Sequence, residues 1–203
     1  MKIIEDGRAP NPRRVRIFLA EKGIDVPFEQ LDIMGLEHKT AERSAQNPFQ
    51  RVPVLVLDDG NVISESIAIC RYFEETQPEP ALFGTTPVAK ATIEMWNRRM
   101  ELNFLFHIAQ HLRHLNPKMA ELEVPQVPEW GRANKDKALT TLTILDEALS
   151  DRQFVAGDRF SVADITTLVG IDFMKPARIE RPEGLANVAR WYGEVSARPS
   201  AAA

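Results

Sequence analysis

The 203-residue sequence contains a single cysteine, Cys70. One cysteine forms neither an intramolecular disulfide nor a cysteine-based metal cluster. No apolar run approaches the roughly 20 residues that a membrane-spanning helix needs. Glu5 and Asp6 stand where a signal peptide carries its apolar stretch. These absences exclude a disulfide scaffold, and they predict a cytosolic protein with no membrane partner.

The sequence also carries little excess charge. Its formal net charge is −4, which argues against the basic surface of a nucleic-acid-binding protein. Apolar residues make up 44% and charged residues 27%, the balance of an ordinary globular protein. A chain of this length holds one large domain or two small ones, each with its own core.

The first 77 residues alternate between strand and helix patterns. The order is strand, helix, strand, then a hairpin and a second helix, over residues 2–4, 12–22, 26–33, 52–63 and 64–77. Asp59-Gly60 between two apolar runs is a strong hairpin signal. We therefore expect a small α/β domain over residues 1–78.

The stretch "RAPNPRR" marks the start of the first helix. We expect Asn11 to be its N-cap, Pro12 its first residue and Gly23 its stop. Lys22 then lies on the buried face, with its ammonium reaching past that face to water. A helix start also favours an anion, because its free N–H groups carry partial positive charge.

The pattern changes after residue 78. Residues 79–87 are rich in proline, glycine and threonine and predict a linker. Four helix patterns and no convincing strand follow over residues 88–203, at 88–115, 128–152, 161–174 and 183–198. We expect an all-helical second domain over residues 88–203.

Two short motifs stand out in the first domain. Val52-Pro53 places a proline at the start of a strand pattern, where it removes a ladder hydrogen bond. "SESIAI" begins with Ser64, Glu65 and Ser66. Either serine can simply cap the helix, and Glu65 then only favours the helix dipole. The same groups also suit the carboxylate and ammonium of an α-amino acid.

Several motifs, in this order and spacing, resemble those of bacterial-type cytosolic glutathione S-transferases. They are "RRVRIFLAEKGI", "EHKTAE", "NPFQRVPVL", "DDGNVISESIAICRYFEE" and "FSVADIT", and they cover nearly the whole chain. The resemblance implies a thioredoxin-like N-terminal domain followed by an all-helical C-terminal domain. It implies glutathione as co-substrate and a homodimer. We expect no metal, because the histidines of the long helix have no carboxylate or cysteine at ligand spacing.

The resemblance also implies a glutathione site made of the residues that match these motifs. They are His38, Lys39, Arg51, Val52, Pro53, Glu65 and Ser66. Val52, beside a cis Pro53, would pair its backbone with the cysteinyl part. Glu65 and Ser66 would hold the γ-glutamyl end, and Lys39 with His38 would reach the glycine carboxylate. Arg51 would bond the peptide or add charge for a carboxylate.

The catalytic turn departs from the family pattern. No Tyr, Ser, Thr or Cys occurs between Met1 and Arg16, and Ala9 stands where serine-type relatives carry the hydroxyl. The remaining side chain that can donate to a thiolate is the amide of Asn11. The turn is closest to nu-class-like transferases, which carry Thr-Pro-Asn. Arg8 either adds compensating charge or is a solvated surface residue.

Two stretches of the helical half carry further predictions. In "FSVADIT", Ser161 and Asp164 predict a capping box with a structural role. On the long helix, Asn103 and His107 are candidates for the pocket of the acceptor molecule, and His107 titrates near neutrality. His114, on the same polar stripe, is expected to be solvated.

Two functions remain open at this point. One is an enzyme that ionises the glutathione thiol for attack on a small electrophile or a disulfide, with Asn11 as the catalytic residue. The other is a non-catalytic binding or regulatory module of the same fold, which the missing hydroxyl at Ala9 favours. Fold alone does not decide between them.

Overall fold

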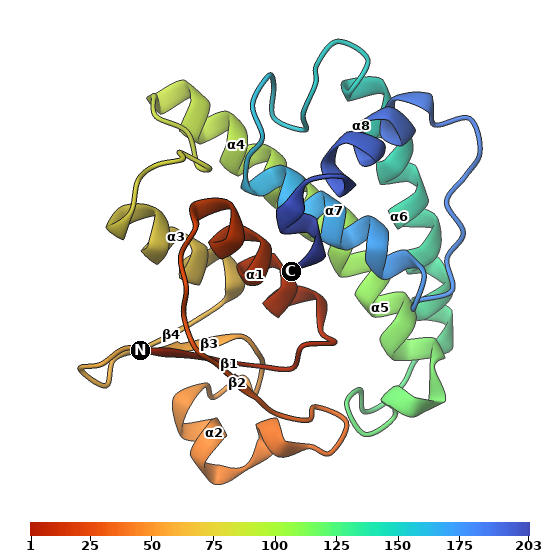
Figure 1. Cartoon of the computed structure of the whole chain (residues 1–203). Coiled ribbons are helices and arrows are strands. Elements are labelled where there is room, and N and C mark those ends of the chain that lie inside the picture. Colours follow the sequence, from red (N-terminus) through yellow and green to blue (C-terminus); the bar gives the residue numbers. More distant parts are fainter. The chain divides into compact units, whose positions relative to one another are not determined.

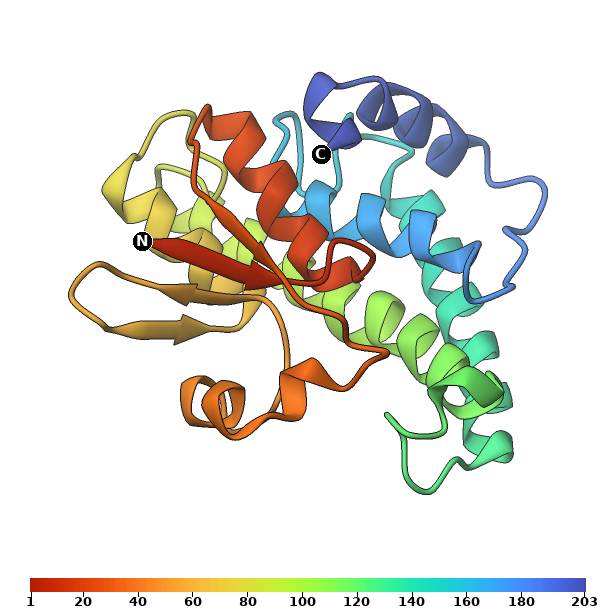
Figure 2. The same ribbon diagram turned by 60° about the horizontal axis from the view of Figure 1, so that its bottom comes forward.

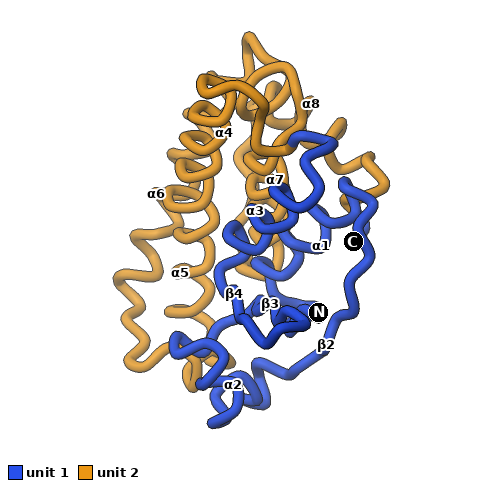
Figure 3. Tube along the Cα trace, turned by 90° about the vertical axis from the view of Figure 1, so that its left-hand side faces the viewer, with its two compact units in different colours: residues 1–81, 202–203 blue, residues 82–201 orange.

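The computed structural model describes all 203 residues and divides into two compact units (Figures 1 and 3). The N-terminal unit comprises Met1–Ala81 with Ala202–Ala203, and the helical unit comprises Leu82–Ala201. The chain passes from the first unit to the second between Ala81 and Leu82, inside the predicted linker of residues 79–87.

The N-terminal unit is built on a four-stranded mixed sheet of order β2-β1-β3-β4. The strands are β1 (Lys2–Glu5), β2 (Phe28–Gln30), β3 (Val54–Val56) and β4 (Val62–Ser64). β1 pairs with β2 in parallel and with β3 antiparallel, and β3 and β4 form the predicted hairpin. This sheet with its helices is a thioredoxin-like fold (Figure 2).

Helices cover both faces of this sheet. α1 (Pro10–Lys22) and α3 (Ser66–Thr76) pack together on one face, and the short α2 (Ala41–Gln46) lies on the other (Figures 1 and 2). Side chains along a strand point alternately to the two faces of the sheet. Ile4 packs with Leu31 and Val54 in one buried apolar cluster. The sequence analysis did not predict α2, because its six residues are mostly polar.

Lys22 corrects one sequence-based expectation. Its side chain is fully buried and forms an ion pair of 2.6 Å with Glu74. Its ammonium also donates to the carbonyl oxygens of Gln77, Pro78 and Pro80. The predicted solvent exposure was wrong because the chain after α3 folds back over the end of α1 and supplies these acceptors.

The helical unit contains five α-helices. They are α4 (Pro87–Met100), α5 (Phe106–Leu115), α6 (Pro128–Ala148), α7 (Val162–Met174) and α8 (Ala186–Ser196). α7 is buried along nearly its whole length, which makes it the centre of this unit. None of the helices is long and apolar enough to cross a lipid bilayer.

A π-helical turn, η2 (Glu101–Leu105), joins α4 to α5. Hydrophobic periodicity predicts one uninterrupted helix here, so the sequence analysis missed this turn. In the structure the turn places Phe104 against Gly170 of α7, so closely that a Cβ atom at Gly170 would lie 2.7 Å from the ring. The hydroxyl of Thr141 donates to the carbonyl of Asn103 at 2.7 Å, which satisfies an acceptor inside the turn.

The capping box at the start of α7 is confirmed. The fully buried Asp164 accepts hydrogen bonds from the Ser161 N–H and hydroxyl, the Val155 N–H and the Trp191 indole. Burial raises the pKa of Asp164 to about 6, although these donors favour the ionised form. One carboxylate thus ties the start of α7 to the loop before it and to α8.

We expect Asp164→Ala to lower the free energy of unfolding by about 3–5 kcal/mol, because it leaves several buried donors without an acceptor. Asp158 is exposed and has no side-chain partner, so Asp158→Ala should change stability by less than about 0.5 kcal/mol. Urea denaturation followed by circular dichroism measures both. Equal midpoints for the two variants would contradict the structural role of Asp164.

Candidate functional site

The first helix begins earlier than expected. Ala9 is the N-cap of α1, Pro10 is the first helical residue, and no side chain caps the helix. Asn11 is therefore inside the first turn, and its prediction as N-cap was wrong. Gly23 ends the helix in the left-handed conformation, as predicted.

Two prolines in this first turn limit its hydrogen-bond donors. Pro10 and Pro12 have no N–H group, so α1 begins with fewer free donors than an ordinary helix. The backbone alone is consequently a weak anion site here. Any strong donor for an anion at this helix start has to come from a side chain.

The side chain of Asn11 is held in a defined orientation. Its amide oxygen accepts a hydrogen bond of 3.2 Å from Nη1 of Arg14. Arg14 is only 1% exposed, whereas Asn11 is exposed. With the oxygen turned toward Arg14, the amide NH₂ is left to donate to a ligand. The sequence analysis did not identify Arg14, because an arginine in a helix gives no local sign of burial.

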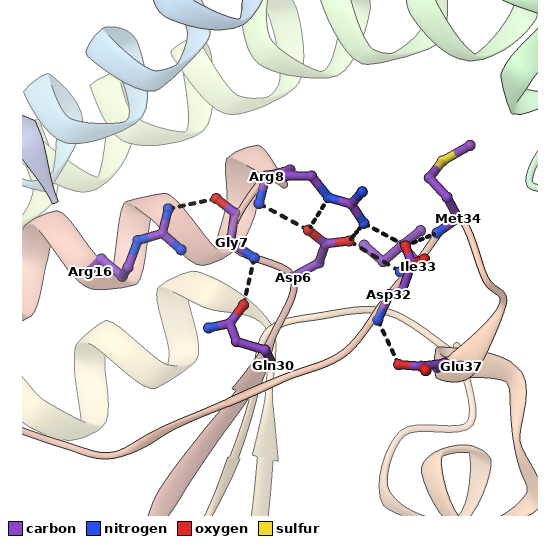
Figure 4. Close-up of polar contacts among 9 residues, drawn as sticks. All are labelled: Asp6, Gly7, Arg8, Arg16, Gln30, Asp32, Ile33, Met34 and Glu37. Carbon is purple, nitrogen blue, oxygen red and sulfur yellow. Dashed lines mark hydrogen bonds and ion pairs between the residues drawn. The ribbon is translucent and has the colours of Figure 1, made fainter.

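Arg8 lies between two carboxylates (Figure 4). Its guanidinium donates to both oxygens of Asp6, at 2.9 and 2.6 Å, and also to Asp32. Asp6, 4% exposed, also accepts from the N–H of Ile33 at 3.1 Å. Arg8 is 65% exposed, so it is the solvated surface residue of the second sequence-based alternative. Its charge is nevertheless matched locally, and it ties β1 to the loop after β2.

These bonds change the acidity of Asp6. The hydrogen bond from the Arg8 side chain is the largest cause that lowers the pKa of Asp6 from 3.8 to about 2. Hydrogen bonds from the N–H groups of Arg8 and Ile33 add to the effect, and burial opposes it. Asp6 is therefore ionised in the folded protein at any pH well above 2.

The loop before β3 presents open backbone groups. The Val52–Pro53 peptide bond is cis, as the resemblance implied. The N–H and carbonyl of Val52 have no hydrogen-bond partner within the chain. An extended peptide can therefore pair with this residue as an added strand would.

Asn47 holds the loop before β3 through two hydrogen bonds. It is 2% exposed, its NH₂ donates to the carbonyl of Arg51 at 2.9 Å, and its oxygen accepts from the N–H of Phe49 at 3.1 Å. Gln50, which lies between Phe49 and Arg51, adopts a positive φ of 52°. Arg51 itself is exposed and free to reach a ligand. The sequence analysis quoted the motif that contains Asn47 but assigned this residue no role.

The start of α3 is also an open donor site. Glu65, not Ser64 or Ser66, is the N-cap residue, and it makes no capping hydrogen bond with its side chain. Both capping interpretations of the serines are therefore wrong. Glu65 has the strained φ of 70°, and its carboxylate is exposed. Ser66 is 5% exposed, and its hydroxyl has no partner in the chain.

His38 and Lys39 belong to a short 3₁₀ turn, η1 (Glu37–Lys39). His38 is 7% exposed, so its ring is part of the interior, whereas Lys39 is exposed. The residue before the turn, Leu36, has a positive φ of 61°. The turn thus offers one accessible cation to a negatively charged group.

In the helical unit, His107 and His111 of α5 bond to residues of α6. The Nδ1 of His107 lies 2.5 Å from the amide oxygen of Asn134. The NH₂ of Asn134 donates to the Trp130 carbonyl at 2.7 Å, which fixes the orientation of this amide. His107 therefore carries its proton on Nδ1, and Nε2 is left as the acceptor.

His114 and Asn103 differ from each other in their surroundings. His114 is 7% exposed, and its Nδ1 accepts from the N–H of Val127 at 3.0 Å. Its predicted solvation was wrong, because the segment leading into α6 covers it. Asn103 is exposed, and its NH₂ donates to the carbonyl of Arg99 at 3.1 Å.

Both units of the chain resemble known proteins of one family. Residues 9–76 match the model of the glutathione S-transferase N-terminal domain, and residues 95–199 match that of the C-terminal domain. Glutathione S-transferase 2 of Saccharomyces cerevisiae is 39% identical over 203 residues, covering 98% of this chain and 87% of the relative.

Solved structures are similar over the same length. A glutathione S-transferase domain-containing protein of Marinobacter aquaeolei is 41% identical, with a TM-score of 0.96, and the match covers 98% of this chain and 99% of that one. The Gtt2 protein of Saccharomyces cerevisiae is 39% identical, with a TM-score of 0.95 and 98% of both chains covered.

The lowered pKa of Asp6 yields a test by pH. A depressed carboxyl pKa stabilises the fold above the unfolded value of 3.8, and this stability is lost as the pH falls through about 2. We expect Asp6→Asn to lower the free energy of unfolding by about 1–2 kcal/mol at pH 7, after allowance for solvent screening at the exposed Arg8.

Urea denaturation at several pH values measures this difference. It should shrink as the pH falls from about 4 toward 2. The exposed Asp25, which has no side-chain partner, supplies the control Asp25→Asn. A difference for Asp6→Asn that stays constant with pH would show that the ion pair with Arg8 contributes nothing.

Proposed function

The chain belongs to the glutathione S-transferase family, and from this we propose that it ionises the thiol of glutathione and transfers the sulfur to an electrophile. Glutathione binds in the N-terminal unit as co-substrate. The acceptor is an electrophilic carbon of a small molecule or a disulfide. The observation that carries the proposal is the Asn11 amide, which the buried Arg14 orients for donation at the start of α1.

The backbone of Val52 and the start of α3 hold the two ends of the γ-glutamyl-cysteinyl part. The open N–H and carbonyl of Val52, beside the cis Pro53, pair with the cysteinyl residue. The α-carboxylate lies at the start of α3, where the Ser66 hydroxyl and free N–H groups donate to it. The exposed Glu65 carboxylate pairs with the α-ammonium.

Cations hold the other end of the tripeptide. Lys39, exposed on its 3₁₀ turn, pairs with the glycine carboxylate, and His38 lies behind it. Arg51 adds a second cation or bonds the peptide. The NH₂ of Asn47 donates to the Arg51 carbonyl and so holds this loop in place. Arg8 supplies no free charge, because Asp6 and Asp32 already match it.

Asn11 stabilises the thiolate by donating its NH₂ to the sulfur. A free thiol of this type has a pKa of about 8.5, and lowering it by two units takes about 2.7 kcal/mol. A hydrogen bond to a charged group contributes about 1.5–3 kcal/mol, and a helix start adds about 0.3–1 kcal/mol. The thiol proton leaves to water, the sulfur lone pair forms the new bond, and the leaving group departs with its electron pair.

The acceptor is bound by the helical unit, and Asn103 and His107 contribute to its pocket. His107, protonated on Nδ1 by its contact with Asn134, has Nε2 available to take up or return a proton. We further propose that the protein acts in the cytosol as a C₂ homodimer, the arrangement that most soluble oligomers adopt.

Absorbance titration of bound glutathione tests the role of Asn11. We expect the thiol pKa of the complex to lie well below that of free glutathione, and Asn11→Ala to raise it by about one unit or more. Asn11→Asp keeps the bond to Arg14 but removes the donor and adds a negative charge, so it should raise the pKa further.

If glutathione binds with no shift of its thiol pKa in any of these proteins, the catalytic proposal fails and a binding module remains. If both variants keep the wild-type shift, the thiolate is stabilised by another group than Asn11.

Steady-state kinetics with a chromogenic acceptor test His107. We expect His107→Ala to change the shape of the pH–rate profile or to raise the acceptor KM severalfold, because the variant lacks Nε2 as a proton acceptor. His111 bonds the Gly131 carbonyl through Nδ1 at 2.9 Å and supplies the matched control His111→Ala. Identical profiles for both variants would remove His107 from the mechanism.

A further inference from the structure

The short helix α2 connects the two segments that carry the cations of the proposed glutathione site. Lys39 is the last residue of η1 and directly precedes Thr40, the N-cap of α2. Asn47, the C-cap of α2, begins the loop that carries Arg51. Both cations are exposed. The place of α2 on its face of the sheet therefore sets the positions of Lys39 and Arg51 together (Figure 1).

No apolar side chain holds α2 on the sheet. None of its six residues is buried, and its sequence, "AERSAQ", contains no apolar residue larger than alanine. A helix this short is not stable by itself and depends on contacts with the rest of the protein. His38 and Asn47, just outside its two ends, are 7% and 2% exposed. The helix between these two residues needs a contact of another kind.

Arg43 supplies this contact through an ion pair. Its side chain is 19% exposed, and its guanidinium pairs with the carboxylate of Glu29 on β2. The guanidinium also donates to the amide oxygen of Gln46 at 2.9 Å, within α2. The other oxygen of Glu29 lies 2.5 Å from the ammonium of Lys2 on β1. One carboxylate thus links α2 to the two neighbouring strands β1 and β2.

The cations around Glu29 keep its carboxylate charged. The hydrogen bond from Lys2 is the largest cause that lowers the pKa of Glu29, and the bond from Arg43 adds to it, whereas burial opposes both. Glu29 is therefore ionised at neutral pH. The contact between α2 and β2 is a pair of opposite charges under the conditions in which the protein binds its substrate.

Two further hydrogen bonds couple α2 to the loop that follows it. The NH₂ of Gln50 donates to the hydroxyl of Ser44 at 2.9 Å. The N–H of Asn47 donates to the carbonyl of Arg43, also at 2.9 Å. Gln50 directly precedes Arg51 in the chain. A shift of α2 would consequently move Arg51 as well as Lys39.

We propose that Arg43 is a positioning residue of the transferase, which fixes α2 through Glu29 and thereby holds Lys39 and Arg51 for the glycine carboxylate of glutathione. This inference rests on the proposed function and deepens it. Arg43 itself contacts neither the tripeptide nor the sulfur. Without the ion pair, local opening of α2 becomes more frequent, and glutathione has to order the segment when it binds. The loss falls on the glycine end, because Val52 and the start of α3 hold the other end.

Isothermal titration with two ligands tests the proposal on the full chain. One ligand is glutathione, and the other is its ethyl ester at the glycine carboxyl group, which has no charge at that end. We expect the wild type to bind glutathione about fivefold or more tightly than the ester. In Arg43→Met, glutathione affinity should fall about three- to fivefold while ester affinity stays nearly constant, so that the ratio of the two affinities approaches one.

Three other variants locate the effect in the ion pair. Glu29→Gln should narrow the ratio as Arg43→Met does, and the double variant should narrow it no further than either single one. Arg43→Lys keeps the charge and should restore part of the ratio.

The control removes an ion pair of the same charges elsewhere. Arg132 and Glu129 of α6 form an exposed pair at 2.9 Å. Arg132→Met therefore makes the same change of net charge as Arg43→Met, and it should leave the wild-type ratio unchanged.

Two outcomes would overturn the proposal alone. If Arg43→Met weakens both ligands equally, Arg43 only stabilises the N-terminal unit. If Arg43→Met keeps the wild-type ratio, α2 is held in place without the ion pair. A wild type that binds neither ligand, or binds both equally, would instead contradict the proposed glutathione site at its glycine end, and the inference about Arg43 would fail with it.

Discussion

The hydrogen bond from Arg14 to Asn11 is the interaction on which the proposed chemistry depends. Pro10 and Pro12 remove backbone donors from the first turn of α1, and no hydroxyl or thiol occurs before Arg16. A side-chain amide is then the one neutral donor at this helix start. An amide has two ends, and only a partner for its oxygen turns the NH₂ outward. Burying an arginine beneath the turn supplies that partner.

Irregular backbone accompanies every segment of the proposed glutathione site. Leu36 precedes the turn with Lys39, Gln50 precedes Arg51 and Val52, and Glu65 is itself the N-cap of α3. In regular strands and helices, the backbone N–H and carbonyl groups form hydrogen bonds with one another. Leaving such groups open to a ligand requires breaks in regular structure, and the surrounding contacts hold these breaks in place. Asn47 does so for one loop, and the Asp6–Arg8–Asp32 cluster does so for another.

The helical unit uses buried polar groups for a different purpose. Asp164 collects donors from three segments around the start of α7, and the histidines of α5 bond to α6 or to the segment before it. These contacts fix the helices relative to one another inside this unit. The same contact that packs α5 against α6 also sets the proton of His107 on Nδ1, so packing and the chemistry of this ring are set by one hydrogen bond.

The sequence by itself determined the family, the order of strands and helices, the Gly23 stop, the Asp59-Gly60 hairpin and the capping box of α7. Each depends on local chemistry: side-chain periodicity, a left-handed glycine, or a serine and an acid three residues apart.

Only the tertiary structure decided the rest. Ala9 replaced Asn11 as the N-cap, Lys22 and His114 were buried, and a π-turn interrupted the long helix. It also brought Arg14 beneath Asn11, Asn47 under its loop, and Arg178 into a position that favours glycine. In most of these cases the deciding partner comes from a distant segment, such as the carbonyls after α3 for Lys22 or Gly170 for Phe104. A pattern that extends over a few residues carries no information on such partners, because burial and pairing arise only when the chain has folded.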